Sequence, residues 1–186
     1  MSFWEWFTLI VGIIGILGFL MAIAPFIQMI YGKPKIEFDF SEKHSDDGTT
    51  IFECAIINPP IDNAILQTIG VTRNIALGTM AIVKIKEKRT GNKLYTDWVK
   101  LISGFGVATQ RADLPSGYIP ARFMVITVYE KTSEVYAGNK LTGEEALLPI
   151  GLYEVSIEVT VSGKVIRTLN RELMVQQTQP FAYWVK

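Results

Sequence analysis

The sequence contains very little cysteine and histidine, and it has no net charge. Cys54 is the only cysteine, so no intrachain disulfide can form, and His44 is the only histidine. Lys and Arg together number 18, as do Asp and Glu. Because a nucleic-acid-binding protein usually carries a strong basic excess, this balance argues against nucleic acid as a partner. A lone thiol also fits a reducing compartment, although it does not require one.

Charge is entirely missing from residues 6–27, where the one polar side chain is Thr8. A helix of this length would extend about 33 Å, and the hydrocarbon core of a bilayer is about 30 Å thick. We therefore expect residues 1–32 to form a single N-terminal transmembrane helix that anchors the rest of the chain. A cleaved signal peptide is the alternative, but the leading residues 1–5 contain no Lys or Arg, which such a signal requires.

Aromatic and cationic residues flank the apolar segment in the manner of membrane-interface anchors, namely Trp4, Trp6, Tyr31, Lys33 and Lys35. Cationic flanks favour the cytoplasmic side of a membrane. All the cations lie after the segment, so we expect a single-pass protein with its N-terminus outside and its large domain in the cytoplasm. The lipid bilayer is then one of its partners.

Small residues gather on one face of the expected helix: Thr8, Gly12, Gly15, Gly18 and Ala22. Such a face lets two helix backbones approach closely. This arrangement predicts a helix-packing face for a protein partner or a second copy of the chain. The alternative is that glycine is simply common in membrane helices.

From residue 33 onward, apolar and polar residues alternate, which is typical of half-buried strands. The alternation is clearest over residues 153–161, and Ser162-Gly163-Lys164 then predicts a hairpin turn. Further strands are expected over residues 36–40, 50–57, 79–86, 93–101, 106–111, 122–130 and 165–176. About eight strands without long amphipathic helices predict an all-β antiparallel sandwich over residues 33–178.

The segment Leu148-Pro149-Ile150-Gly151-Leu152-Tyr153 contains a Gly-x-Tyr pattern. It resembles the beginning of a late strand in immunoglobulin-like domains. That resemblance implies an immunoglobulin-like sandwich in which the tyrosine hydroxyl bonds to nearby backbone. It concerns the fold and implies no function. The cysteine pair of antibody domains is missing, so membership of the antibody class is not expected.

Residues able to carry chemistry are scattered. His44 lies in a polar loop with Asp46 and Asp47, but a transition-metal site generally needs three or four protein ligands. Cys54 shares a strand face with apolar neighbours, which indicates a core residue. We therefore predict no catalytic residues, no metal, no cofactor and no small-molecule substrate, and hence a protein that is not an enzyme. An enzyme would need His44 and Asp46 to meet carboxylates distant in the sequence.

The chain ends in an aromatic tail over residues 179–186. It contains Phe181, Tyr183 and Trp184, whose apolar surface would be costly to leave in water. The tail is either a last strand packed on the domain or a contact for a partner.

Together these features predict a membrane-anchored, non-catalytic β-sandwich that acts as a binding or scaffolding module at the membrane surface. The alternative is a structural subunit of an oligomeric membrane complex, assembled through the small-residue helix face.

Overall fold

The computed structural model describes residues 2–102, 108–117, 119–139 and 144–185. The chain forms two compact units. The first contains residues 1–34 and 60–74, and the second contains residues 35–59 and 75–186. The predicted boundaries at residues 33 and 178 stay predictions.

The first unit contains helix α1 (Phe3–Tyr31) and the short helix α2 (Ala64–Thr68). Helix α1 begins with a capping box, in which Ser2 and Glu5 exchange side-chain and backbone hydrogen bonds. Near its other end, the Gln28 amide nitrogen donates to the Thr72 carbonyl at 2.7 Å and its oxygen accepts from the Thr72 N–H at 3.0 Å. This two-way contact fastens the segment that follows α2 to the last turns of α1.

The expectation of a transmembrane anchor is wrong. Among the residues that the structure describes, neither α1 nor α2 is long and apolar enough to cross a membrane. The sequence argument depended on the absence of charge over residues 6–27. Helix α1 also includes Glu5 before that run and Gln28 after it, and Gln28 is engaged by the neighbouring segment. The single-pass location, the outside N-terminus and the cytoplasmic domain depended on that anchor, so these predictions are overturned with it.

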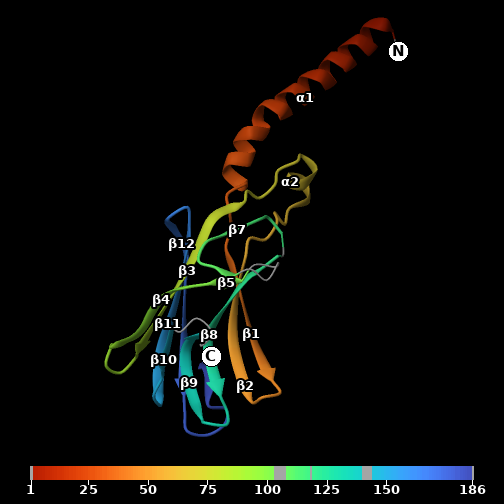
Figure 1. Cartoon of the computed structure of the whole chain (residues 1–186). Coiled ribbons are helices and arrows are strands. Elements are labelled where there is room, and N and C mark those ends of the chain that lie inside the picture. The colour runs from red at the N-terminus through yellow and green to blue at the C-terminus, as the bar shows by residue number, and fades with distance from the viewer. Residues whose placement is uncertain (1, 103–107, 118, 140–143, 186) are drawn as a thin grey trace. The chain divides into compact units, whose positions relative to one another are not determined.

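The second unit is a sandwich of two antiparallel sheets, as the alternation predicted (Figure 1). One sheet has the order β1-β2-β8, and β8 also pairs with β5 and β9, which continue to β6 and β10. The other sheet has the order β13-β12-β11-β3-β4, with β7 also paired to β3. The first sheet contains β1 (Glu37–Ser45), β2 (Thr49–Ile57), β5 (Leu101–Ile102), β6 (Ala108–Thr109), β8 (Ala121–Tyr129), β9 (Glu134–Asn139) and β10 (Glu144–Leu147). The second contains β3 (Ala76–Glu87), β4 (Lys93–Val99), β7 (Ala112–Leu114), β11 (Gly151–Val161), β12 (Lys164–Val175) and β13 (Ala182–Val185).

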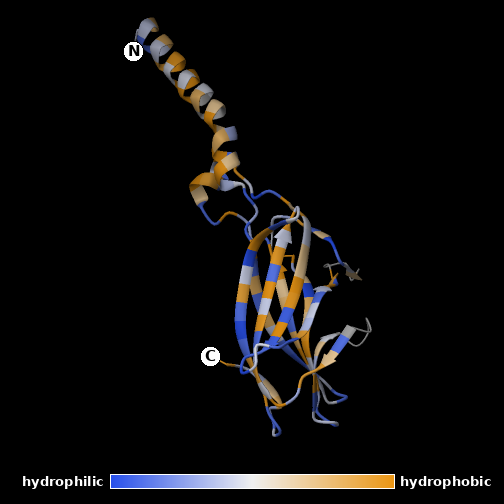
Figure 2. Ribbon diagram, turned by 90° about the vertical axis from the view of Figure 1, so that its left-hand side faces the viewer, coloured by the Kyte–Doolittle hydropathy of each residue, from blue (hydrophilic) through white to orange (hydrophobic). Residues whose placement is uncertain are grey.

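The core lies between the sheets and is built by alternate residues of the long strands. On β11, Tyr153, Val155, Ile157 and Val159 are buried, while Glu154 is exposed. Figure 2 shows the same alternation as orange and blue segments along the strands. Because successive side chains of a strand point to opposite faces, this pattern places one face of each sheet against the other.

The expected strand over residues 93–101 is interrupted. β4 ends at Val99 in one sheet, and β5 begins at Leu101 in the other. The chain therefore changes sheets at Lys100, a change that a continuous apolar pattern does not reveal. The expected strand over residues 106–111 falls partly on residues 103–107, outside the described part of the chain.

Candidate binding sites beside the C-terminal strand

The aromatic tail forms strand β13, which pairs antiparallel with the end of β12. In the register, Trp184 stands opposite the buried Leu173, and Tyr183 stands opposite Met174. Trp184 therefore faces the interior of the sandwich, and Tyr183, which is 38% exposed, faces outward. For Trp184, the structure agrees with the alternative of a last strand packed on the domain. A partner contact through Phe181 or Tyr183 stays a prediction.

Trp184 joins the two sheets. Its ring lies edge-on to Phe40 of β1 and Phe52 of β2, with centroids 5.5 and 6.0 Å away. The Arg171 guanidinium of β12 lies 4.1 Å from the Phe40 centroid and 5.9 Å from that of Trp184. Arg171 therefore lies over the rings of Phe40 and Trp184, which is a favourable cation–π arrangement.

Strand β13 covers only part of the β12 edge. It pairs with Glu172–Val175, and no other described strand pairs with β12 on this side from Lys164 to Arg171. The Gln176 N–H donates to the Phe181 carbonyl at 2.9 Å, toward β13. Backbone groups of successive residues in an antiparallel strand point to alternate sides. The N–H and C=O groups of Asn170 and Thr168 therefore point to the open edge.

A groove of about 840 Å³ lies where β13 ends and this open edge begins. We call it the β12 groove, and its lining residues are Lys88, Glu154, Asn170, Arg171, Glu172, Trp184 and Val185. Lys88 and Glu172 form an ion pair in it at 2.5 Å. The groove thus combines charged side chains, the indole ring of Trp184 and part of the strand edge that no described strand covers.

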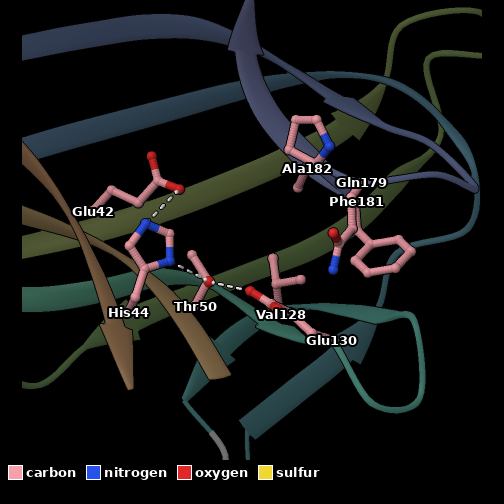
Figure 3. A pocket seen from close by; sticks show the side chains of 9 residues that line it. Glu42, His44, Thr50, Val128, Glu130, Gln179, Phe181 and Ala182 are labelled. Carbon is pink, nitrogen blue, oxygen red and sulfur yellow. Dashed lines mark hydrogen bonds and ion pairs between the residues drawn. The ribbon is translucent and has the colours of Figure 1, made fainter. Parts of the chain in front are cut away.

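A second cavity, of about 360 Å³, lies at the beginning of the tail, and we call it the His44 cavity (Figure 3). It is lined by Glu42, His44, Thr50, Val128, Glu130, Gln179, Pro180, Phe181 and Ala182. The His44 Nδ1 lies 2.8 Å from the Thr50 hydroxyl, which donates to Glu130 Oε1 at 2.9 Å. The His44 Nε2 lies 3.7 Å from Glu42 Oε1. Sequence reasoning found His44 but not Thr50 or Glu130, because Glu130 is 80 residues from Thr50 in the chain.

The other chemical candidates are not brought together. The register places His44 opposite Thr50 and places Cys54 opposite Phe40, so His44 does not stand beside the thiol. Burial raises the pKa of the Cys54 thiol well above its usual range. Hydrogen bonds from Thr49 lower the pKa of the Asp47 carboxyl. Within the described residues, no three His, Cys, Asp or Glu side chains are arranged to hold a metal ion. The prediction of no metal site stays a prediction for the whole chain.

The predicted helix-packing face lies uncovered on α1. A Cβ atom added at Gly12, Gly15 or Gly18 would meet no described heavy atom within 4 Å, and Ala22 is exposed. The Thr8 hydroxyl donates to the Trp4 carbonyl at 2.8 Å. A shallow groove of about 640 Å³ follows this face, lined by Trp4, Glu5, Thr8, Leu9, Gly12, Ile13 and Ile16.

The structure shows what surrounds the five predicted membrane-interface anchors, which are Trp4, Trp6, Tyr31, Lys33 and Lys35. Trp4 packs edge-on against Phe3 and Phe7, and Trp6 is exposed. The Arg73 guanidinium donates to the carbonyls of Tyr31 and Lys33. Lys35 forms an ion pair with Glu37. The anchoring role assigned to these five residues stays a prediction.

Comparison with known proteins adds little. No family model matches the chain, and no curated protein matches it. Among solved structures, 74% of the chain aligns with a Bacteroides fragilis protein provisionally named a beta-galactosidase, at 14% identity and a TM-score of 0.37. The alignment spans 16% of that protein's length, and a likeness of this strength carries no argument about function.

Proposed function

We propose that the sandwich is a non-catalytic binding module that holds an extended segment of a partner protein by strand addition to the open edge of β12. The observation that supports this most directly is the backbone of Thr168 and Asn170, which pairs with no described strand on this side and continues the line of β13 into the β12 groove. A peptide in this position would gain main-chain hydrogen bonds from the edge and side-chain contacts from the groove.

The side chains of this edge distinguish it from the other sheet's edge at β1. Val165 and Ile166 of β12 are 59% and 47% exposed. Native sheets usually protect free edges with charged residues or with a covering segment. The exposed half of β1 contains Glu42, Lys43 and His44, whereas β12 presents two large aliphatic side chains beside its free backbone. A partner strand that covers Val165 and Ile166 would remove apolar surface from water.

The charges of the edge indicate the kind of segment that it would accept. Residues 164–171 contain Lys164, Arg167 and Arg171 and no acidic side chain. Arg167 already donates to the Ile36 carbonyl at 2.8 Å, and Arg171 is held against Phe40, so both guanidinium groups are positioned before a partner arrives. We therefore propose a partner segment that alternates acidic and apolar residues.

The immunoglobulin-like character of the sandwich is part of this proposal. It is supported by Tyr153, whose hydroxyl donates to the Pro149 carbonyl at 2.5 Å, in keeping with the Gly-x-Tyr resemblance. Domains of this architecture support many unrelated functions, so the argument for binding depends on the β12 edge and not on the fold.

The test uses the full-length protein and a fluorescein-labelled, seven-residue synthetic peptide that alternates glutamate and valine. We expect saturable binding by fluorescence anisotropy, and an affinity about tenfold weaker for Asn170→Pro, since proline removes a donor from the open edge. The thermal midpoint of Asn170→Pro should stay near that of the wild type, because edge positions whose N–H faces solvent tolerate proline.

Two controls make the outcome specific. Leu169→Pro should lower the thermal midpoint clearly, because the Leu169 N–H points to the opposite side, toward β11. A peptide with lysine in place of glutamate should bind more weakly than the acidic peptide. Equal affinity of the wild type and Asn170→Pro for the acidic peptide would refute strand addition at this edge.

A second candidate function is structural, namely self-assembly through the small-residue face of α1. It is favoured by the uncovered glycines and by the groove that follows Thr8 and Gly12. Replacing Gly12 and Gly15 together by leucine should abolish assembly as measured by light scattering, because the bulkier side chains keep two helix backbones apart. Peptide binding at β12 should be unchanged in that variant. Replacing Ile14 by leucine is the matched control and should leave the measured mass unchanged.

A further inference from the structure

The direction of the hydrogen bonds in the His44 cavity follows from the single proton of the Thr50 hydroxyl. That proton is given to Glu130 Oε1 at 2.9 Å, so the hydroxyl oxygen accepts from His44 Nδ1 at 2.8 Å. The Nδ1 atom of the ring is therefore the protonated nitrogen. Thr50 itself is buried, which keeps this orientation in place.

The other ring nitrogen then has a predictable role. In the neutral ring, a protonated Nδ1 leaves Nε2 as a hydrogen-bond acceptor. This Nε2 lies 3.7 Å from Glu42 Oε1, which is also an acceptor (Figure 3). A group with several N–H donors that lies against both atoms can donate to each of them.

The rest of the wall matches a cationic group with a short apolar stem. Val128, Pro180, Phe181 and Ala182 supply apolar surface, and Glu42 and Glu130 supply negative charge. None of the described residues that line the cavity is Lys or Arg. Its volume of about 360 Å³ is at the lower end of the range for small-molecule sites, about 300–1,000 Å³.

We propose that the His44 cavity binds a primary ammonium group, with Glu42 and His44 Nε2 as its hydrogen-bond acceptors, Glu130 as a second negative charge, and Phe181 against the apolar stem. An ammonium group has three donors and no acceptor, which suits this set of partners. The group can belong to a free alkylamine or to a lysine side chain, and both present the same chemistry. This proposal is independent of strand addition, since the described lining of the cavity includes no residue of β12.

The experiment titrates the full-length protein with n-butylammonium chloride at neutral pH and follows the His44 ring and the Val128 methyl groups by NMR. We expect saturable shifts at these residues with a Kd of the order of 1 mM, which is reasonable for a ligand of so few atoms. The neutral analogue n-butanol, which has the same number of heavy atoms, should bind about tenfold more weakly or worse, since it lacks the charge. Shifts that are still unsaturated at about 0.1 M, or equal binding of the alcohol, would overturn the proposal.

Matched variants locate the site. Glu42→Gln and Glu130→Gln should each weaken butylammonium binding about tenfold. In Glu130→Gln, the amide oxygen of the new side chain can still accept from Thr50, so the relay to His44 and the thermal midpoint should be retained. Glu158→Gln, on β11 of the other sheet, where Glu158 pairs with Lys84, should bind as the wild type does. If Glu42→Gln and Glu130→Gln both bound like the wild type, the ammonium would not lie between these carboxylates and the inference would fail.

A last titration distinguishes a lysine side chain from a free alkylamine as the source of the ammonium group. A capped Ala-Lys-Ala tripeptide should also shift the His44 ring. Tighter binding than butylammonium assigns the site to a lysine side chain, and weaker binding assigns it to a free amine. A tripeptide with norleucine in place of lysine, which lacks the ammonium group, should not bind, and equal binding of the two tripeptides would count against ammonium recognition.

Discussion

Tyr153 shows how one polar atom is accommodated in the core of this sandwich. The residue is fully buried, and its hydroxyl donates to the Pro149 carbonyl four residues earlier. Burial, with a smaller contribution from the negative charge of Glu87, raises the pKa of the hydroxyl above its ordinary value near 10. The same side chain thus contributes apolar area, one hydrogen bond and a pH dependence.

Removing the hydroxyl tests its contribution. Tyr153→Phe should lower the free energy of unfolding by about 1 kcal/mol, the usual net value of a hydrogen bond. Urea unfolding at pH 7 measures the change. A cost near zero would mean that the Pro149 carbonyl is equally well satisfied by water.

The pH dependence follows from the raised pKa. The neutral hydroxyl is favoured in the folded state, so its contribution is complete below the unfolded value near 10 and is lost as the pH rises above it. Wild-type stability should therefore fall more steeply above about pH 10 than that of Tyr153→Phe. Parallel urea titrations at increasing pH measure this difference, and identical curves would contradict it.

Cys54, like Tyr153, is a buried residue whose pKa is raised by burial. It is fully buried, and desolvation is the largest cause of its raised pKa. Because the thiolate is the reactive form, a thiol reagent should label Cys54 in the native protein only as fast as the protein unfolds. Stopped-flow labelling at several urea concentrations checks this expectation. Rapid labelling of the native protein would show that the thiol is accessible.

The hairpin of β11 and β12 illustrates what a short sequence signal can determine at the level of elements. Its turn residues Ser162 and Gly163 have φ angles of 50° and 76°. Positive φ at both central residues is the type I′ geometry, whose twist matches that of paired strands. The sequence predicted a turn here, and the structure places Val161 opposite Lys164 at its base.

Gly163 can be tested at the same scale. Gly163→Ala should lower the free energy of unfolding by about 1 kcal/mol, because a Cβ atom disfavours the left-handed conformation. No described neighbouring atom lies within 4 Å of the added Cβ, so the cost would be conformational. Gly151→Ala is the control, since its Cβ would make only ordinary contacts and no positive φ is involved. Thermal unfolding compares the two, and an equal effect would contradict the argument.

The pairing of β2 with β8 contains a β-bulge, which the alternation of apolar and polar residues in the sequence did not indicate. Phe52 pairs with Ile126, but Glu53 pairs with Met124, so Val125 is an extra residue in β8. Both Val125 and Ile126 are buried as a result. The extra residue shifts the alternation by one position, which turns two successive side chains toward the core.

At the scale of the whole molecule, the C-terminal strand closes the sandwich. Trp184 is near the end of the chain in sequence, yet its ring contacts Phe40 and Phe52 of the opposite sheet. These contacts join the last strand of one sheet to the first two strands of the other.

The two faces of β13 provide a matched pair of substitutions. Trp184→Ala should destabilise the protein by about 2–4 kcal/mol, because it removes a large aromatic contact between the sheets. Tyr183→Ala, one residue earlier and facing outward, should cost less than about 1 kcal/mol. Urea unfolding of both variants measures the difference. Similar costs would mean that the tail does not bridge the sheets.

The sequence by itself determined the β-rich class and the position of most long strands, because burial on one face of a sheet repeats every second residue. It also located the Ser162–Gly163 turn and the tyrosine of the Gly-x-Tyr pattern, since both depend on neighbouring residues. It misjudged α1, because the absence of charge over residues 6–27 predicted a membrane span, whereas neither described helix is long and apolar enough to form one.

Only the tertiary structure decided which strands pair and which edge has no partner among the described strands. The approach of Glu130 to Thr50 and His44, and of Phe181 to the same cavity, joins residues far apart in the chain. Such contacts depend on strand order and register over the whole sandwich, and they leave no periodic pattern in the sequence.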